Sequence, residues 1–144
     1  AENDAYFGVD SIGTESGGGG LNTTLRDLAR FGEMIRNDGR FNGRQILPKS
    51  VIDDIRRGGD PAKFAKAGYA TLPGWSYRNM WWISNNAHHA FEARGIHGQA
   101  IYIDPEAQMT VVRYASHPIA ANGANDPITL PAFAALADFL MHQK

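Results

Sequence analysis

The 144-residue chain contains no cysteine, and neither sign of charge dominates it. The absence of cysteine excludes a disulfide scaffold, a zinc site with thiolate ligands and a cysteine nucleophile. With 14 lysine and arginine residues against 15 aspartate and glutamate residues, no strong field of one sign attracts nucleic acid or an anionic membrane surface. No apolar run approaches the roughly 20 residues of a membrane span. We therefore expect a neutral or small partner, with no nucleic acid and no membrane.

Several catalytic motifs are also absent. None of the serines stands in a G-x-S-x-G or an S-x-x-K pattern, so no nucleophile is visible: Ser11, Ser16, Ser50, Ser76, Ser84 and Ser116. Four histidines fall between His88 and His117 without H-E-x-x-H or H-x-H spacing, which favours solvated loop residues over a metal site. The run Gly17–Gly20 lacks the Lys-Ser/Thr of a phosphate-binding loop and indicates a flexible approach loop. No metal or cofactor is implied.

The first half of the chain carries a clear helical pattern. Thr24 followed by Asp27 resembles a capping box, and Asn37-Asp38-Gly39 supplies a stop signal. Between them, small and apolar residues recur on one helical face: Leu25, Leu28, Ala29, Gly32 and Ile35. These signals predict a helix that follows an irregular loop over residues 1–20.

A second, shorter helix is expected after Pro48, because proline is favoured at a first helical position. Val51, Ile52 and Ile55 follow at helical spacing, and Gly58-Gly59 ends the pattern. Residues 58–74 mix small apolar groups with two prolines, which predicts a surface excursion outside the core.

In the second half the apolar period changes from 3.6 to 2. Three antiparallel strands are expected at residues 77–84, 100–103 and 109–114, with a hairpin loop at 104–108. A closing helix is expected at residues 131–142. The prediction is one α+β domain, with helices and loops over 1–75 and the sheet and closing helix over 76–144. The first two helices have no evident partner, so we expect part of the domain to lie outside this chain.

Two features could carry chemistry. The segment Ala93-Arg94-Gly95-Ile96-His97-Gly98-Gln99 places two glycines against an apolar strand, which marks either a structural bulge or a close approach of a ligand to the backbone. A free backbone N–H there would suit the developing oxyanion of acyl transfer. Trp75, Trp81 and Trp82 favour core packing, with the lining of an apolar pocket as the alternative for one of them.

Three stretches resemble a known family: "GGGLNTTLRDLARFGEMIRNDG", "NMWW" and "GIHGQAIYIDPE". They are similar to segments of the serine hydrolases of the class C β-lactamase, D-Ala-D-Ala-peptidase and family VIII esterase type. Within that family the likeness is greatest to hydrolases of 6-aminohexanoate (nylon) oligomers. The resemblance implies that the chain is the C-terminal portion, about a third, of one β-lactamase-like domain, an antiparallel sheet flanked by helices.

The resemblance also implies an activity, namely hydrolysis of a small linear amide or ester through an acyl-enzyme. The nucleophile and base would come from an N-terminal segment of the same enzyme that carries the Ser-x-x-Lys and Tyr motifs. It allows a homodimer of the complete enzyme, and we expect a cytoplasmic location and no cofactor. A non-catalytic binding or structural module of the same fold is the alternative, and a metal enzyme using the histidines is a weaker one.

The family's K-T-G motif aligns with Ala93-Arg94-Gly95, so the lysine and threonine that hold a β-lactam carboxylate are missing while Gly95 is retained. The resemblance therefore favours amides or esters over penicillins. It assigns the oxyanion-hole N–H to Ile96 as the catalytic contribution. It also places substrate-binding residues along the cleft: Gly17, Trp82, Arg94, Gly95, His97 and Gln99.

Overall fold

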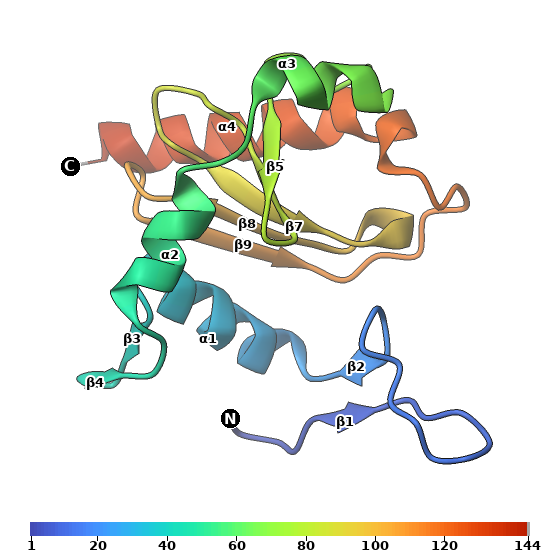
Figure 1. Cartoon of the computed structure of the whole chain (residues 1–144). Coiled ribbons are helices and arrows are strands. Elements are labelled where there is room, and N and C mark those ends of the chain that lie inside the picture. The colour runs from blue at the N-terminus through green and yellow to red at the C-terminus, as the bar shows by residue number, and fades with distance from the viewer. Residues whose placement is uncertain (144) are drawn as a thin grey trace.

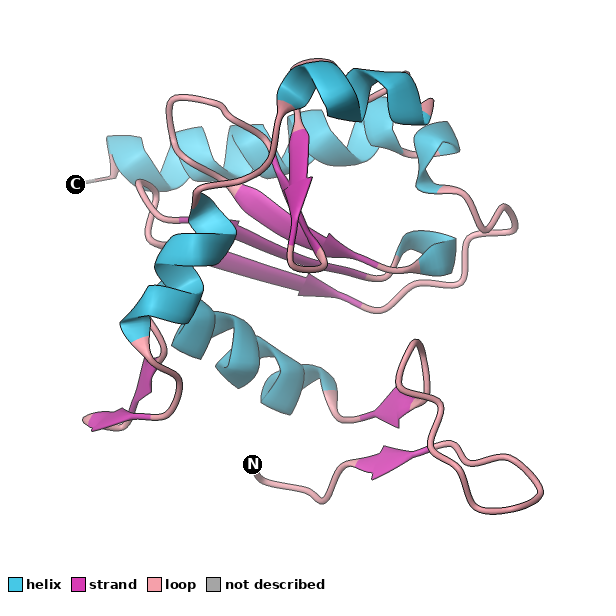
Figure 2. Cartoon of the chain, viewed as in Figure 1, coloured by secondary structure: helices cyan, strands magenta, loops and turns pink. Residues whose placement is uncertain are grey.

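The computed structural model describes residues 1–143, and its centre is a five-stranded antiparallel sheet (Figures 1 and 2). The strands are β5 (Ser76–Arg78), β6 (Trp81–Ile83), β7 (Phe91–Arg94), β8 (Ala100–Asp104) and β9 (Met109–Arg113). Their order in the sheet is their order in the chain, so each strand pairs with the next. This meander sets β7 and β8 inside the sheet, with residues 95–99 connecting them.

The expectation of three strands is wrong, because the sequence pattern did not reveal two further short strands of the sheet. Residues 77–84 form a tight hairpin in which Asn79 and Met80 turn the chain with φ angles of 49° and 69°. Left-handed conformations at both central positions are typical of a two-residue hairpin turn. Residues 91–94 form a strand of their own, so the glycines at 95 and 98 lie in a connection and not within a strand.

One face of the sheet is covered by α1 (Leu25–Arg36) and α2 (Lys49–Arg56). The predicted cap is confirmed, since the backbone N–H of Asp27 donates to Oγ1 of Thr24 over 3.2 Å. Gly32 brings α1 close to the sheet, because a Cβ there would lie 2.6 Å from a methyl of Thr110. The buried cluster under these helices joins helix and strand residues: Met34, Ile35, Ile52, Ile55, Trp81, Ile83, Phe91, Ile101 and Ile103. The two helices therefore have a partner within this chain, contrary to expectation.

The opposite face is covered by α4 (Asp126–His142), which begins five residues earlier than the sequence suggested. Phe133 and Ala137 pack against Tyr102 and Met109, and the rings of Phe133 and Tyr102 lie 5.0 Å apart. Figure 1 shows α1 and α4 on opposite sides of the sheet. The fold is thus a three-layer α+β arrangement in which helices from both ends of the chain enclose the sheet.

Residues 58–74 contribute to the core, which corrects the expectation of a surface excursion. They form α3 (Pro61–Phe64) and a 3₁₀ turn (Ala65–Ala67). Phe64, Leu72 and Trp75 are buried together, with Trp82 and Leu130 packed against them. This small cluster fixes the loop at 68–71 beside the sheet.

The remaining strands are two short hairpins, β1 (Tyr6–Phe7) with β2 (Leu21–Asn22) and β3 (Arg40–Phe41) with β4 (Arg44–Gln45). The first hairpin lies away from the sheet (Figure 1, blue), within the region predicted to be an irregular loop. Within residues 1–143, no helix is long and apolar enough to cross a membrane.

Candidate functional site

A cavity of about 560 Å³ opens where the end of β7 meets two loops. Its walls come from residues 68–71, residues 94–96, and residues 120–123 together with Asp126. Trp82 of β6 also lines it, and the same side chain borders a second hollow of about 370 Å³ beside Ala93 and Met80. Cavities of this size hold small molecules, and the mainly apolar lining suits an uncharged chain.

The turn between β7 and β8 leaves one backbone donor free. Within residues 95–99, every amide except that of Ile96 donates a hydrogen bond: Gly95 to Gln99 O (2.9 Å), His97 to Ala120 O (3.0 Å), Gly98 to Asn122 Oδ1 (3.1 Å) and Gln99 to Ile96 O (3.2 Å). The N–H of Ile96 has no acceptor among residues 1–143. Ile96 is 66% exposed and lines the cavity. The turn therefore presents an unpaired N–H at Ile96, the residue to which the family resemblance assigns the oxyanion donor.

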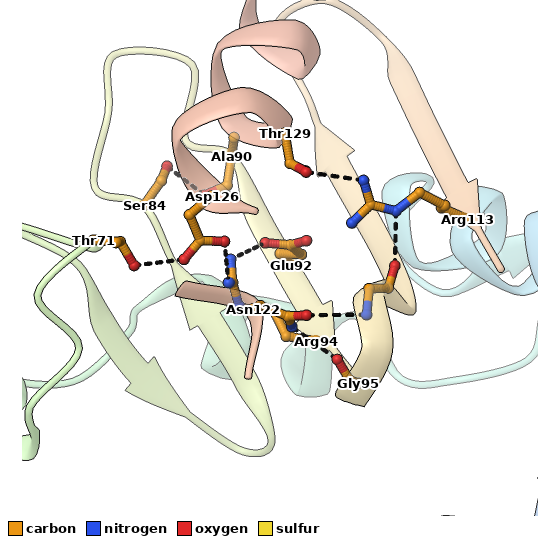
Figure 3. A network of polar contacts seen from close by, with 11 residues as sticks. Thr71, Ser84, Ala90, Glu92, Arg94, Gly95, Arg113, Asn122, Asp126 and Thr129 are labelled. Carbon is orange, nitrogen blue, oxygen red and sulfur yellow. Dashed lines mark hydrogen bonds and ion pairs between the residues drawn. The ribbon is translucent and has the colours of Figure 1, made fainter. Parts of the chain in front are cut away.

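Arg94 lies at the same edge of the cavity, but its charge is already engaged. Its Nη1 donates to Glu92 Oε2 over 2.8 Å, and its Nη2 donates to Asp126 Oδ1. Thr71 in turn donates to Asp126 Oδ2 over 2.6 Å, so β7, α4 and the 68–71 loop are joined (Figure 3). The side chains of Glu92, Arg94 and Asp126 are 3–7% exposed. The guanidinium thus has two protein carboxylates as partners before any substrate arrives.

The electrostatics of this cluster favour a proton on Glu92. Burial raises the pKa of Glu92 to about 7, and the attraction of Arg94 offsets this only in part. Burial is the largest cause, and the nearby carboxylate of Asp126 raises the pKa of Glu92 further.

The aromatic wall is built around Trp82. Trp75 and Trp81 are buried in the core, as core packing predicts. Trp82 is half-buried and lines the cavity, which is the pocket-lining alternative expected for one tryptophan. The ring of Tyr69 meets that of Trp82 edge to face at 6.4 Å and stacks on Phe64 at 5.2 Å. The indole Nε1 of Trp82 is buried without a hydrogen-bond partner among residues 1–143.

Three other predicted site residues do not face the cavity. The imidazole Nδ1 of His97 lies 2.7 Å from the carbonyl oxygen of His117. The side-chain amide of Gln99 bonds to both backbone groups of Ala115. Gly17 lies in the exposed loop of the N-terminal hairpin and is not among the residues that line the cavity. The structure brings together Trp82, Arg94, Gly95 and Ile96 at this cavity. Gln99 borders the second hollow, which Trp82, Arg94 and Gly95 also line.

Three further residues at the cavity were not predicted from the sequence: Tyr69, Asn122 and Asp126. Tyr69 lay in the segment taken for a surface excursion, and Asn122 and Asp126 lay between the last expected strand and the expected closing helix. All three line the cavity. Two asparagines and a glycine directly before an apolar helix mark a turn, but that signal does not tell which strand the turn contacts.

Two of the four histidines in this region, His88 and His97, have ring nitrogens within hydrogen-bond distance of protein groups. His88 Nδ1 lies 2.8 Å from Oδ2 of Asp104, whose side chain is 1% exposed, so His88 is not the solvated loop residue that was expected. Among the described residues, no group of three or more histidine, aspartate or glutamate side chains is placed to hold a metal ion.

The class of protein follows from comparison with known families. Residues 1–133 match the family model described as Beta-lactamase, and the chain therefore belongs to the beta-lactamase family. It is 31% identical over 119 residues to the 6-aminohexanoate-dimer hydrolase of Paenarthrobacter ureafaciens, a match over 82% of this chain and 30% of that protein.

A solved structure is similar as well. A Bacillus anthracis protein with the provisional name 6-aminohexanoate-dimer hydrolase matches with a TM-score of 0.78 and 37% identity, over 94% of this chain and 34% of that chain. The chain thus spans about a third of the length of these relatives. The predicted β-lactamase-like α+β fold is confirmed.

Proposed function

We propose that the chain forms the oxyanion side and one cleft wall of a serine hydrolase with the β-lactamase fold. The observation that carries the proposal is the unpaired N–H of Ile96 at the mouth of the cavity. This amide borders a cavity and has no acceptor among residues 1–143, so it is free to donate a hydrogen bond to a bound ligand. Relatives in the same family carry the name hydrolase, which agrees with this role.

In the proposed reaction, a serine from the segment with the Ser-x-x-Lys and Tyr motifs attacks the substrate carbonyl. The carbonyl oxygen gains the electron pair and is held as an oxyanion by the N–H of Ile96 and by the nucleophile's own N–H. The lysine and tyrosine take the serine proton and deliver a proton to the leaving amine or alcohol. Water then attacks the acyl-enzyme, releases the acid and restores the serine.

The proposed substrates are linear amides such as 6-aminohexanoate oligomers, with esters as further substrates. The names of the relatives point to the oligomers, and the apolar walls at Tyr69, Trp82 and Ile96 suit a methylene chain. Hydrolysis of penicillins is not favoured, because Ala93 and Arg94 stand where a lysine and threonine would hold the β-lactam carboxylate. The guanidinium of Arg94 is also held by Glu92 and Asp126.

The test uses the complete protein in which this chain is joined to the nucleophile-bearing segment. The substrates are the linear 6-aminohexanoate dimer and an activated ester. Ile96→Pro removes the donor, and we expect kcat to fall by about 100-fold with little change in KM. Ile96→Ala is the matched control, because it keeps the N–H and should retain most of kcat.

Unchanged turnover in folded Ile96→Pro would overturn the oxyanion assignment. A complete protein without a Ser-x-x-Lys serine, and without activity on amides or esters, would favour the alternative of a non-catalytic module of the same fold.

A further inference from the structure

We propose that Asn122 is a positioning residue for the oxyanion donor, an inference that rests on the proposed function of Ile96. The side-chain amide of Asn122 spans the turn between β7 and β8. Its Nδ2 donates to the carbonyl oxygen of Gly95 over 2.8 Å, and its Oδ1 accepts from the N–H of Gly98 over 3.1 Å (Figure 3). Both bonds cross more than 20 residues of sequence, so they tie the loop before α4 to the end of β7.

The bond to Gly95 acts directly on the catalytic donor. The carbonyl of Gly95 and the N–H of Ile96 belong to the same peptide group, which is planar and trans. Fixing the carbonyl toward Asn122 therefore fixes the N–H in the opposite direction. In addition, a hydrogen bond to a peptide oxygen polarises the group and strengthens its N–H as a donor. One contact thus sets both the direction and the strength of the oxyanion donor.

The backbone of the turn needs this support. His97 adopts a φ of +55°, a left-handed conformation that non-glycine residues rarely take. Gly98 follows with a φ of +89°, and a Cβ at Gly98 would lie 2.2 Å from the ring of His117. Such a turn persists only where the surroundings hold it, and the second bond of Asn122 holds Gly98.

Asn122 is itself held in place. It begins a 3₁₀ turn, and its carbonyl accepts from the N–H of Asn125 over 2.8 Å, directly before α4. The same loop makes a further contact, in which His97 donates its backbone N–H to the carbonyl of Ala120. Asn122 therefore transmits the position of the loop before α4 to the peptide that carries the Ile96 N–H.

The chemistry of the position selects an amide side chain, because one group must donate to a carbonyl and accept from an N–H at the same time. Asn122→Asp keeps the acceptor for Gly98 but turns a carboxylate oxygen toward the carbonyl of Gly95. Asn122→Ala removes both bonds. The matched control is Asn125→Ala, since the side chain of Asn125 makes no hydrogen bond among residues 1–143.

The experiment measures kcat and KM of the complete protein on the linear 6-aminohexanoate dimer, together with inhibition by an alkyl boronic acid. The boronic acid forms a tetrahedral adduct with the serine, and one of its oxygens occupies the oxyanion site. We expect Asn122→Ala and Asn122→Asp to lower kcat by about 10- to 100-fold, with KM changed less than about twofold. Boronic acid affinity should fall in parallel with kcat, whereas Asn125→Ala should match the parent protein in both.

The amide resonance of Ile96 supplies a readout independent of activity. In ¹⁵N-labelled protein, both Asn122 variants should shift or broaden this resonance and speed exchange of the Gly98 amide, and Asn125→Ala should not. If kcat, boronic acid affinity and the Ile96 resonance stay unchanged in either folded variant while Ile96→Pro loses activity, the positioning role is wrong and the proposed function stands. If Ile96→Pro also keeps full activity, the proposed function itself fails. Should Asn122→Ala not fold, Asn122→Asp decides the question by the same readouts.

Discussion

Arg94 and Asp126 form a buried ion pair that joins the last residue of β7 to the first residue of α4. The pair lies directly beside Gly95 and Ile96, so the strand end that precedes the free N–H is anchored twice to residues 122–126, by the charge of Asp126 and by the amide of Asn122. This double anchoring explains how a connection of five residues keeps a defined shape at the edge of an open cavity.

Replacement of Arg94 should destabilise the fold strongly. In Arg94→Met the carboxylates of Glu92 and Asp126 lose their shared cation while still buried, and we expect a loss of about 3 to 5 kcal/mol of unfolding free energy at pH 8. Urea unfolding followed by circular dichroism measures the change. Lys49→Met is the control, because the Lys49–Asp53 pair is exposed and should contribute less than about 1 kcal/mol. Equal losses in the two variants would contradict the role of burial.

The stability of the protein should depend on pH through Glu92. Its pKa is raised from the usual 4.5 to about 7 by burial, so folding favours the protonated form. The resulting stabilisation is fully present below pH 4.5 and is lost as the pH rises through 7. Glu92→Gln should remove this dependence, and the difference in unfolding free energy between the two proteins should change by about 3 kcal/mol between pH 4.5 and 7.5. A constant difference across that window would show that Glu92 titrates normally.

A side chain at position 32 should destabilise the protein. A Cβ would lie 2.6 Å from a methyl of Thr110 and 3.0 Å from a methyl of Ile101, and both belong to β-branched side chains with few alternative rotamers. Gly32→Ala should lower the unfolding free energy by about 1 to 3 kcal/mol despite the better helix propensity of alanine. Gly19→Ala serves as the control, because a Cβ there meets no atom within 4 Å. A neutral or stabilised Gly32→Ala would show that α1 can move away from the sheet.

Tyr69 should contribute to substrate binding more than to the chemical step. Its ring lines the cavity between Phe64 and Trp82 and lies on the loop that faces Ile96 across the opening. In the complete protein, Tyr69→Ala should raise KM for the linear dimer by about 10-fold with kcat nearly unchanged, because a methylene chain loses apolar contact in ground and transition state alike. Tyr6→Ala, on the exposed hairpin, should leave both constants as they are. A fall in kcat alone would place Tyr69 in the chemistry instead.

The sequence predicted those parts of the fold that depend on neighbouring residues. Thr24 and Asp27 are three positions apart, and they form the cap of α1 as expected. The hairpin at Asn79 and Met80 was missed, because an apolar run with a two-residue turn and no glycine resembles one longer strand. The contact of Arg94 with Glu92 is also local, because alternate residues of one strand lie on the same face.

The site was predictable only in part. Ile96 followed from the resemblance to a family, and the free N–H agrees with that assignment. Asn122 and Asp126 reach β7 from more than 25 residues away, and no local pattern indicates which strand they meet. His97 and Gln99 were placed in the cleft by the family resemblance; their side chains contact the backbone of the loop at 115–117, and Gln99 also borders the second hollow.

The arrangement of the layers also sets an order of assembly. The sheet is a meander of neighbouring strands under α1, so its first face is complete once β9 has been made. The second face, with Tyr102 and Met109, stays open until Phe133 and Ala137 arrive with α4. Asn122 and Asp126 come in the same late segment, so closure of the apolar face and locking of the turn at Ile96 are one event. A nascent chain that stalls before α4 would therefore expose apolar surface, hold no shaped site and be prone to aggregation.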